Sequence, residues 1–147
     1  MKIVKGMSAL WLEISRCFQK LQTNALMSTG GVFMIKGIGT DIVSIERIRH
    51  LNKQEGFAKR ILSDEELAVY CDFTNNTRKV EYLAGRFAAK EAISKVGILR
   101  RRGASFTDFV IINDETGTPH LMSPKIDGLH LSISHDTDYA VAFVVVE

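Results

Sequence analysis

Three charged residues in two separated segments have the types and spacing expected for phosphate chemistry. Asp41 ends an apolar run that begins at Gly37, and Glu91 and Lys95 lie one helical turn apart in the segment 85–95. Carboxylates bind hard divalent cations, and an ammonium group offsets the charge of a phosphate. Together the two segments indicate metal-assisted phosphoryl-group chemistry.

The segment around Glu91 has the periodicity of an amphipathic helix. At about 100° per residue its apolar residues form one arc, into which Glu91 and Lys95 also fall. The apolar residues of this arc are Leu83, Ala84, Phe87, Ala88 and Ala92. We expect the two charges to lose hydration there, which is unfavourable unless a partner, metal or ligand compensates. The alternative is an i,i+4 pair that only stabilises the helix, by roughly 0.2–0.5 kcal/mol.

The strand that carries Asp41 is expected to present an open face. Gly37 and Gly39 have the same parity as Asp41, so the face beside the carboxylate lacks side chains. Another backbone or a ligand can therefore approach it closely. The alternative is that Asp41 only caps or turns the chain before the next helix.

Three motifs together resemble a known enzyme family. The segments 37–43, 83–92 and 131–135 read Gly-Ile-Gly-Thr-Asp-Ile-Val, Leu-Ala-Gly-Arg-Phe-Ala-Ala-Lys-Glu-Ala and Leu-Ser-Ile-Ser-His. Their order and spacing resemble the holo-acyl-carrier-protein synthases, the small bacterial class of 4'-phosphopantetheinyl transferases. The resemblance extends from Met34 to the C-terminus. It implies a fold of the 4'-phosphopantetheinyl transferase type, with a largely antiparallel sheet packed on a long helix.

The resemblance also implies a reaction and a set of site residues. Enzymes of this class move the 4'-phosphopantetheine arm of coenzyme A onto a serine of apo acyl carrier protein and release adenosine 3',5'-bisphosphate, a reaction of fatty acid biosynthesis. It implies Mg²⁺ held by Asp41 and Glu91, with Lys95 at the pyrophosphate, and Arg86 and His135 at the nucleotide phosphates. The serine proton passes either to Glu91 or to a metal-bound water.

His135 has a second interpretation. It continues the parity of Leu129, Leu131 and Ile133, which places it on the core-facing side of a half-buried strand. A lone histidine at such a position is more often a structural residue with satisfied hydrogen bonds.

A basic stretch follows the first strand. Its residues are Arg47, Arg49, His50, Lys53, Lys59 and Arg60. Such a run is often only a solvated face, but the resemblance implies that it docks the acidic carrier protein, with Arg47 and Arg60 at matching positions. The resemblance further implies a homotrimer with sites at the subunit boundaries, where one subunit supplies the metal ligands and its neighbour the docking helix. The β-branched and aromatic residues of 139–146 are compatible with such an interface.

The remaining pattern places helices first and strands last, which indicates an α+β fold. Ser44 is the expected N-cap of a first helix, and Ser63 with Glu66 forms a capping box for a second. A strand is predicted at 34–43, helices at 45–51, from 64 and at 78–96, and strands at 109–113, 120–122, 129–133 and 139–146. The segment 96–102 departs from the family's Phe-Gly-Thr-Gly run, so its three arginines are either phosphate contacts or solvated charges.

Bulk composition fits one globular domain. The chain has 147 residues, of which 46% are apolar and 24% charged, and a net charge of +2 that says little about partners. Cys17 and Cys71 lack metal-ligand spacing, which favours a protein with reduced cysteines in the cytoplasm. We expect no transmembrane helix. We interpret residues 1–33 as a dispensable extension of a domain at 34–147, with a targeting peptide as the alternative.

Two rival functions remain. A small basic nucleic-acid-binding α+β domain would use the arginines at 100–102 and the basic stretch as phosphate contacts. It leaves Asp41 and Glu91 unexplained and lacks aromatics interleaved on a β platform. A catalytically silent module of the same fold is disfavoured by the joint presence of Asp41, Glu91 and Lys95. We therefore expect coenzyme A and acyl carrier protein as partners, and neither nucleic acid nor membrane.

Overall fold

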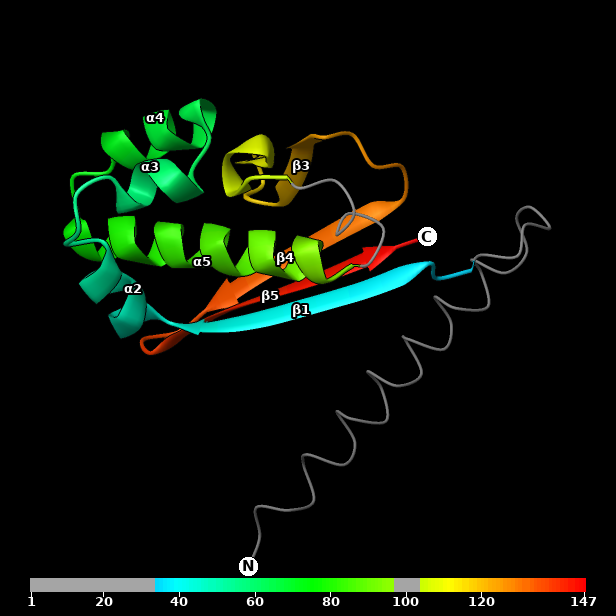
Figure 1. The fold of residues 1–147 in the computed structure, drawn as a ribbon, viewed down its shortest axis with the longest axis horizontal. Helices are drawn as coiled ribbons and strands as arrows, with labels where there is room; N and C mark the ends of the chain where they lie inside the picture. The colour runs from blue at the N-terminus through cyan, green and yellow to red at the C-terminus, as the bar shows by residue number, and fades with distance from the viewer. Residues whose placement is uncertain (1–33, 97–103) are drawn as a thin grey trace, which may run out of the picture. The chain divides into compact units, whose positions relative to one another are not determined.

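The long helix α5 (Asn76–Lys95) lies between a three-stranded sheet and a layer of shorter elements (Figure 1). The computed structural model describes residues 34–96 and 104–147. The predicted extension at 1–33 and the arginines at 100–102 lie outside these residues. No helix within the described part of the chain is long and apolar enough to cross a membrane.

The other elements follow the order that the sequence predicts, with the short helices Phe57–Ile61 and Phe106–Asp108 added. In chain order they are β1 (Gly37–Ser44), α2 (Ile45–Leu51), α3 (Phe57–Ile61), α4 (Asp64–Asp72), then after α5 the 3₁₀ helix η1 (Phe106–Asp108), β2 (Val110–Asn113), β3 (Pro119–Ser123), β4 (Leu129–His135) and β5 (Tyr139–Val146). The α+β class is confirmed, and among the described residues β1 is the one strand that precedes the helices.

All strand pairs are antiparallel. The main sheet has the order β1-β5-β4, with Gly37 opposite Val146 and Ser44 opposite Tyr139 along the full length of β1. On the other side of β5, Leu129 of β4 also lies opposite Val146. The strands β2 and β3 form a separate two-stranded sheet, a division that the sequence pattern did not predict.

Helix starts follow the predicted caps. Ser44 accepts a hydrogen bond from the backbone N–H of Arg47, and the Ser63–Glu66 capping box is present. The side chain of Asn75 caps α5, which therefore begins two residues before the predicted start at 78. The five-residue helix α3 was not predicted, because it has no side-chain cap and begins after Gly56, whose φ of 79° lies in the left-handed region.

The prediction that Glu91 and Lys95 point into the apolar face of the long helix is wrong for Lys95. The side chain of Lys95 is 52% exposed and Glu91 is half-buried, whereas Lys90 is fully buried and Arg86 nearly so. The reason is that α5 contacts the sheet on one side and α3 and α4 on another (Figure 1). Arg86 and Lys90 are therefore buried outside the predicted arc, while Lys95, the last residue of the helix, stays exposed.

A buried charge network joins these layers. The carboxylate of Glu66, at the start of α4, forms an ion pair with Lys90 of α5 and also accepts from the backbone N–H groups of Ser63 (2.8 Å) and Ile111 (3.0 Å). Lys90 donates its other hydrogen bond to the carbonyl of Ile61, at 2.7 Å. Burial lowers the pKa of the Lys90 ammonium, while the neighbouring Glu66 carboxylate acts in the opposite direction.

We predict that Glu66→Gln lowers the free energy of unfolding by about 3–5 kcal/mol, because it leaves the buried Lys90 ammonium without its counter-ion. The double variant Glu66→Gln/Lys90→Met should lose less than the single variant, since it removes both charges. Urea denaturation measures both. Glu65→Gln, on an exposed neighbour, is the matched control and should stay within about 1 kcal/mol of the parent; equal losses at 65 and 66 would contradict the prediction.

Candidate active site

The open face of β1 is filled by the backbone of α5. A Cβ atom on Gly39 would overlap the carbonyl oxygen of Ala92, and one on Gly37 would lie 2.6 Å from Cγ1 of Val96. The glycines thus allow the helix to approach the strand directly. This approach brings the helical turn that carries Glu91 against the strand that carries Asp41.

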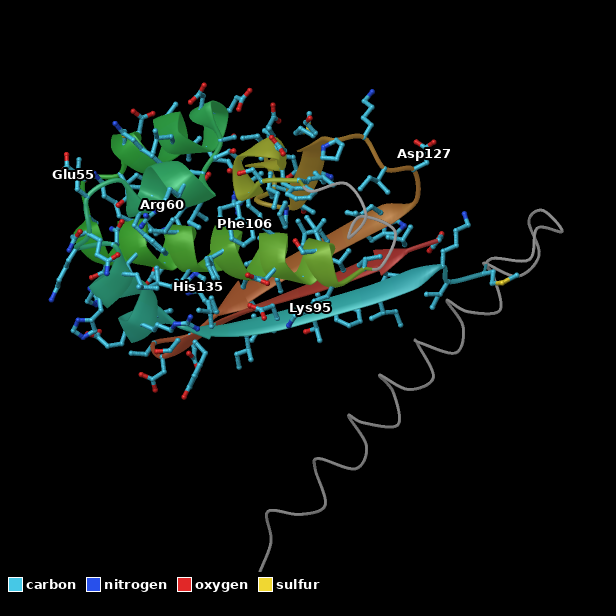
Figure 2. All side chains as sticks on the ribbon, viewed as in Figure 1. Glu55, Arg60, Lys95, Phe106, Asp127 and His135 are labelled. Carbon is cyan, nitrogen blue, oxygen red and sulfur yellow. The ribbon has the colours of Figure 1, made fainter. Side chains whose placement is uncertain are left out.

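Asp41 and Lys95 form an ion pair at this junction. Nζ of Lys95, which Figure 2 labels, lies 2.8 Å from Oδ1 of Asp41 and 2.9 Å from the carbonyl oxygen of Thr40. Lys95 therefore binds across to β1 rather than pairing along the helix with Glu91. The alternative role of Asp41 as a helix cap is also wrong, because Ser44 is the N-cap of α2.

The donor set at this junction fits a hard cation. Asp41 already lies against one cation, and Glu91 makes no ion pair within residues 34–96 and 104–147. In the same residues there is no group of three or more His, Cys, Asp and Glu side chains that could enclose a metal. A metal held here would thus use at most two protein carboxylates and complete its coordination with water and phosphate, which is the pattern of Mg²⁺.

A second group of residues surrounds a hollow of about 180 Å³ between α5, β4 and the β2–β3 sheet. His135 lies here, at the exposed end of β4 on the same side as Ile133, with Nε2 3.3 Å from Nη1 of Arg78. His135 does lie on the same side of β4 as Ile133, as predicted, but its side chain is exposed rather than buried. The strand ends at His135, where no other element among the described residues covers it. Gly85 forms part of the wall, where an added Cβ would approach Ile133 to 3.1 Å.

Arg86 enters the same hollow from a nearly buried position. Its Nε donates to the carbonyl of Ile111 at 3.1 Å and its Nη2 to Oδ1 of Asn113 at 2.7 Å. The guanidinium lies 4.4 Å from the ring centroid of Tyr82. Burial raises the pKa of Tyr82, whose hydroxyl has no hydrogen-bond partner among the described residues. The hollow is also lined by the carboxylate of Glu81, which lies 3.5 Å from Nη1 of Arg78. Its two arginines outnumber this one carboxylate among the described residues, so the hollow suits an anion.

Sequence reasoning missed four polar residues of this hollow, Arg78, Glu81, Tyr82 and Asn113. Arg78 and Tyr82 lie eight and four residues before Arg86, which is the spacing of one helix face, so the periodicity contained a usable signal. Asn113 comes from β2 and had no such signal, because only the tertiary structure brings this strand to α5.

A larger hollow, of about 1050 Å³, lies elsewhere and fits an anion poorly. It is bounded by the start of α4, η1 and β2, and its lining includes the carboxylates of Asp64, Glu65 and Asp108 with Lys59 as the cation among the described residues. The smaller hollow is the better candidate for binding a phosphate, because its lining has two arginines and one carboxylate, Glu81, among the described residues.

The predicted docking residues are exposed on α2 and α3. Arg47 of α2 is free of ion pairs among the described residues, whereas Arg49 and His50 both contact Glu46, at 3.0 and 3.1 Å. Arg60 lies beside the ring of Phe57, with 5.9 Å between Cζ and the centroid (Figure 2).

The predicted site residues thus form two groups on opposite flanks of α5. At about 100° and 1.5 Å per residue, Lys95 lies roughly 180° around the helix from Arg86 and roughly 13 Å along it. Asp41, Glu91 and Lys95 belong to the β1 flank, and Arg86 and His135 to the β4 flank.

Comparison with known proteins identifies the class to which this fold and site belong. The model of the 4'-phosphopantetheinyl transferase superfamily matches residues 37–144, and the chain belongs to this superfamily. The holo-[acyl-carrier-protein] synthase of Geobacillus sp. (strain WCH70) is 49% identical over 117 residues, covering 78% of this chain and 98% of the relative. That of Bacillus subtilis (strain 168) is 45% identical over 118 residues, covering 78% and 97%. Within the superfamily the chain groups with the holo-[acyl-carrier-protein] synthases, and it is an enzyme of the phosphopantetheinyl transferase class.

Solved structures agree. A holo-(acyl-carrier-protein) synthase from Bacillus anthracis in complex with CoA (3',5'-ADP) has a TM-score of 0.70 and 41% identity, covering 78% of this chain and 98% of that one. The Helicobacter pylori enzyme in complex with coenzyme A has a TM-score of 0.63 and 36% identity, covering 75% and 99%. The resemblance and the fold class drawn from the sequence are confirmed.

We predict that Gly39→Ala is more damaging than Gly37→Ala. The added methyl at 39 meets a backbone carbonyl that cannot move without shifting α5, whereas the one at 37 meets a valine side chain that can rotate. Gly39→Ala should lower the melting temperature more than Gly37→Ala does, and should reduce turnover by displacing Glu91 from β1. Differential scanning fluorimetry and transferase assays measure both effects, and equal losses for the two variants would contradict the close-approach argument.

Proposed function

We propose that the chain transfers the 4'-phosphopantetheine arm of coenzyme A to a serine of apo acyl carrier protein, with Mg²⁺, releasing adenosine 3',5'-bisphosphate. In this reaction the serine oxygen forms a bond to the phosphorus of the arm, and the bond from that phosphorus to the bridging oxygen breaks. The observation that carries the proposal is the junction of Asp41, Glu91 and Lys95 in a chain whose relatives include enzymes bound to coenzyme A.

Each group of residues has a task in this reaction. Asp41 and Glu91 would hold Mg²⁺, which supplies charge neutralisation at the pyrophosphate when it is bound. Lys95 would leave Asp41 for a phosphate oxygen and offset charge on the leaving group. Glu91 would accept the serine proton, with a metal-bound water as the alternative acceptor. Arg86, His135 and Arg78 would bind the nucleotide phosphates in the hollow on the β4 flank.

A mass measurement tests the proposed function. The full chain and a chain that begins at Met34 are each incubated with coenzyme A, Mg²⁺ and apo acyl carrier protein, and the carrier is weighed intact. A gain equal to the phosphopantetheine arm supports the proposal, and no gain with several carriers would overturn it. Activity of the shorter chain would support our assignment of the catalytic domain to 34–147. A cytoplasmic location and a role in fatty acid biosynthesis stay predictions.

We predict that Asp41→Asn and Glu91→Gln each reduce kcat/KM by roughly 100-fold or more, because each removes one anionic ligand from a hard cation. The Mg²⁺ concentration needed for half-maximal activity should rise in both variants while the melting temperature changes little. Asp127→Asn and Glu55→Gln make the same chemical changes at exposed positions far from the junction and serve as controls (Figure 2). Normal turnover of either site variant at the parent's Mg²⁺ concentration would exclude that carboxylate as a ligand.

Docking of the carrier is assigned to α2 and α3. We predict that Arg47→Glu/Arg60→Glu raises the KM for the carrier about tenfold and changes the KM for coenzyme A less than twofold, because exposed charges mainly steer and orient a partner. The difference should shrink with added salt, since the Debye length is only about 8 Å at physiological ionic strength. Lys125→Glu, on the exposed β3–β4 connection, is the control. Equal effects on the two substrates would contradict the assignment.

We also propose that the enzyme is a homotrimer in which two subunits complete each site. The face of the main sheet away from α5 carries exposed apolar side chains, which no element within 34–96 and 104–147 covers (Figure 1). They are Ile38, Ile42, Tyr139, Val141 and Phe143. A patch of this kind favours association of copies. The residues of the β1 flank and those of the β4 flank lie on opposite sides of α5. One coenzyme A molecule could therefore contact both kinds of residue more easily if it lay between two subunits, with the β1 flank of one facing the β4 flank of the other.

Complementation tests this assembly. Glu91→Gln is defective on the β1 flank and Arg78→Glu/His135→Ala on the β4 flank, so we predict that each is inactive alone and that joint refolding restores activity above either parent. Light scattering should give a mass of about three chains. A monomeric mass, or no recovery in a verified mixed oligomer, would mean that each subunit contains a complete site.

A further inference from the structure

The side chain of Arg86 is held on one edge only. Its Nε and Nη2 groups donate to the carbonyl of Ile111 and to Oδ1 of Asn113, so two of its five N–H groups are engaged. These two donors form the same edge of the guanidinium plane. The adjacent edge, formed by Nη1 and the second N–H of Nη2, has no hydrogen-bond partner among the described residues, and it suits two oxygens of one phosphate.

Ile111, whose carbonyl accepts from Nε of Arg86, is itself held in place by Glu66. Glu66 accepts a hydrogen bond from the N–H of Ile111 at 3.0 Å and lies 3.6 Å from Nε of Arg86. Glu66 is buried and is fixed in turn by Lys90 and by the N–H of Ser63. One carboxylate therefore lies between two cations. The other carboxylate of the hollow, Glu81, pairs with Arg78 at 3.5 Å, so the group of Glu66, Lys90 and Arg86 keeps one net positive charge for a bound anion. The Tyr82 ring covers the plane of the guanidinium.

Asn113 is the exposed member of this arrangement. It ends β2, it lines the hollow, and its side-chain oxygen is 2.7 Å from Nη2 of Arg86. Without that oxygen the distal end of the guanidinium could rotate toward solvent, and its free edge would no longer be held toward the hollow. Binding of the ligand would then include the entropy cost of ordering the Arg86 side chain, which weakens the affinity.

We propose that Asn113 is a positioning residue for coenzyme A binding, which acts by fixing the guanidinium of Arg86 through the edge next to its free edge. Glu66 has a similar role for Ile111, the other hydrogen-bond partner of Arg86, because it accepts from the N–H of Ile111 and so holds this residue in place. This inference rests on the proposed function, in which Arg86 binds a phosphate of the nucleotide.

A double-mutant cycle tests the inference. We expect Asn113→Ala to raise the KM for coenzyme A roughly fivefold or more, with the KM for the carrier and the melting temperature nearly unchanged. Arg86→Lys keeps a positive charge but lacks the planar fork, and it should raise the same KM further. In the Arg86→Lys background, Asn113→Ala should change the KM less than twofold, because the group on which Asn113 acts is absent. Asn76→Ala, at an exposed asparagine of α5, is the matched control.

The remaining outcomes separate the possible failures. If Asn113→Ala raised the KM by the same factor in both backgrounds, Asn113 would contact the ligand itself and the positioning role would be wrong. If Arg86→Lys raised the KM and Asn113→Ala did not, the positioning role would fail while the proposed function stood. If Asn113→Ala lowered the melting temperature and impaired both substrates equally, its role would be structural. If Arg86→Lys left the KM for coenzyme A unchanged, the phosphate-binding role of Arg86 would fail, and the inference with it.

Discussion

The carboxylate of Glu66 is the contact on which the arrangement of this domain depends. It caps its own helix, neutralises the buried Lys90 of α5 and binds the backbone of β2. Separating any of these elements would leave a charge or an N–H group buried without a partner, which is far less favourable than losing an exposed pair. The elements α4 and β2 are therefore fixed to α5 by polar contacts, in addition to the apolar core.

The opposite side of α5 is fixed by a different kind of contact. Gly39 lets the backbone of the helix reach β1, and any side chain at that position would force the two apart. The helix is thus held from both sides, one by charge and one by close backbone approach. Because Lys95 and Arg86 belong to the same rigid helix, the register of α5 sets the positions of both groups of site residues at once.

Local signals in the sequence were sufficient for most elements and for the outline of the site. The caps at Ser44 and Ser63 act within one turn of chain, so they could be recognised without knowing the fold. The helix α3 could not, because its start depends on the backbone conformation of Gly56 rather than on a side-chain cap. Asn113 could not either, since nothing near it in the sequence refers to Arg86, its partner across the fold.

The sequence by itself determined the family, the α+β class and the pairing of Asp41 with the helix that carries Glu91 and Lys95, because these follow from motifs and from strand and helix periodicity. Only the tertiary structure decided that Lys90 and Arg86, not Lys95, are the buried charges of that helix. It also decided that a backbone fills the glycine face of β1. The physical reason is that periodicity describes the faces of one element, whereas burial depends on how many neighbours cover them.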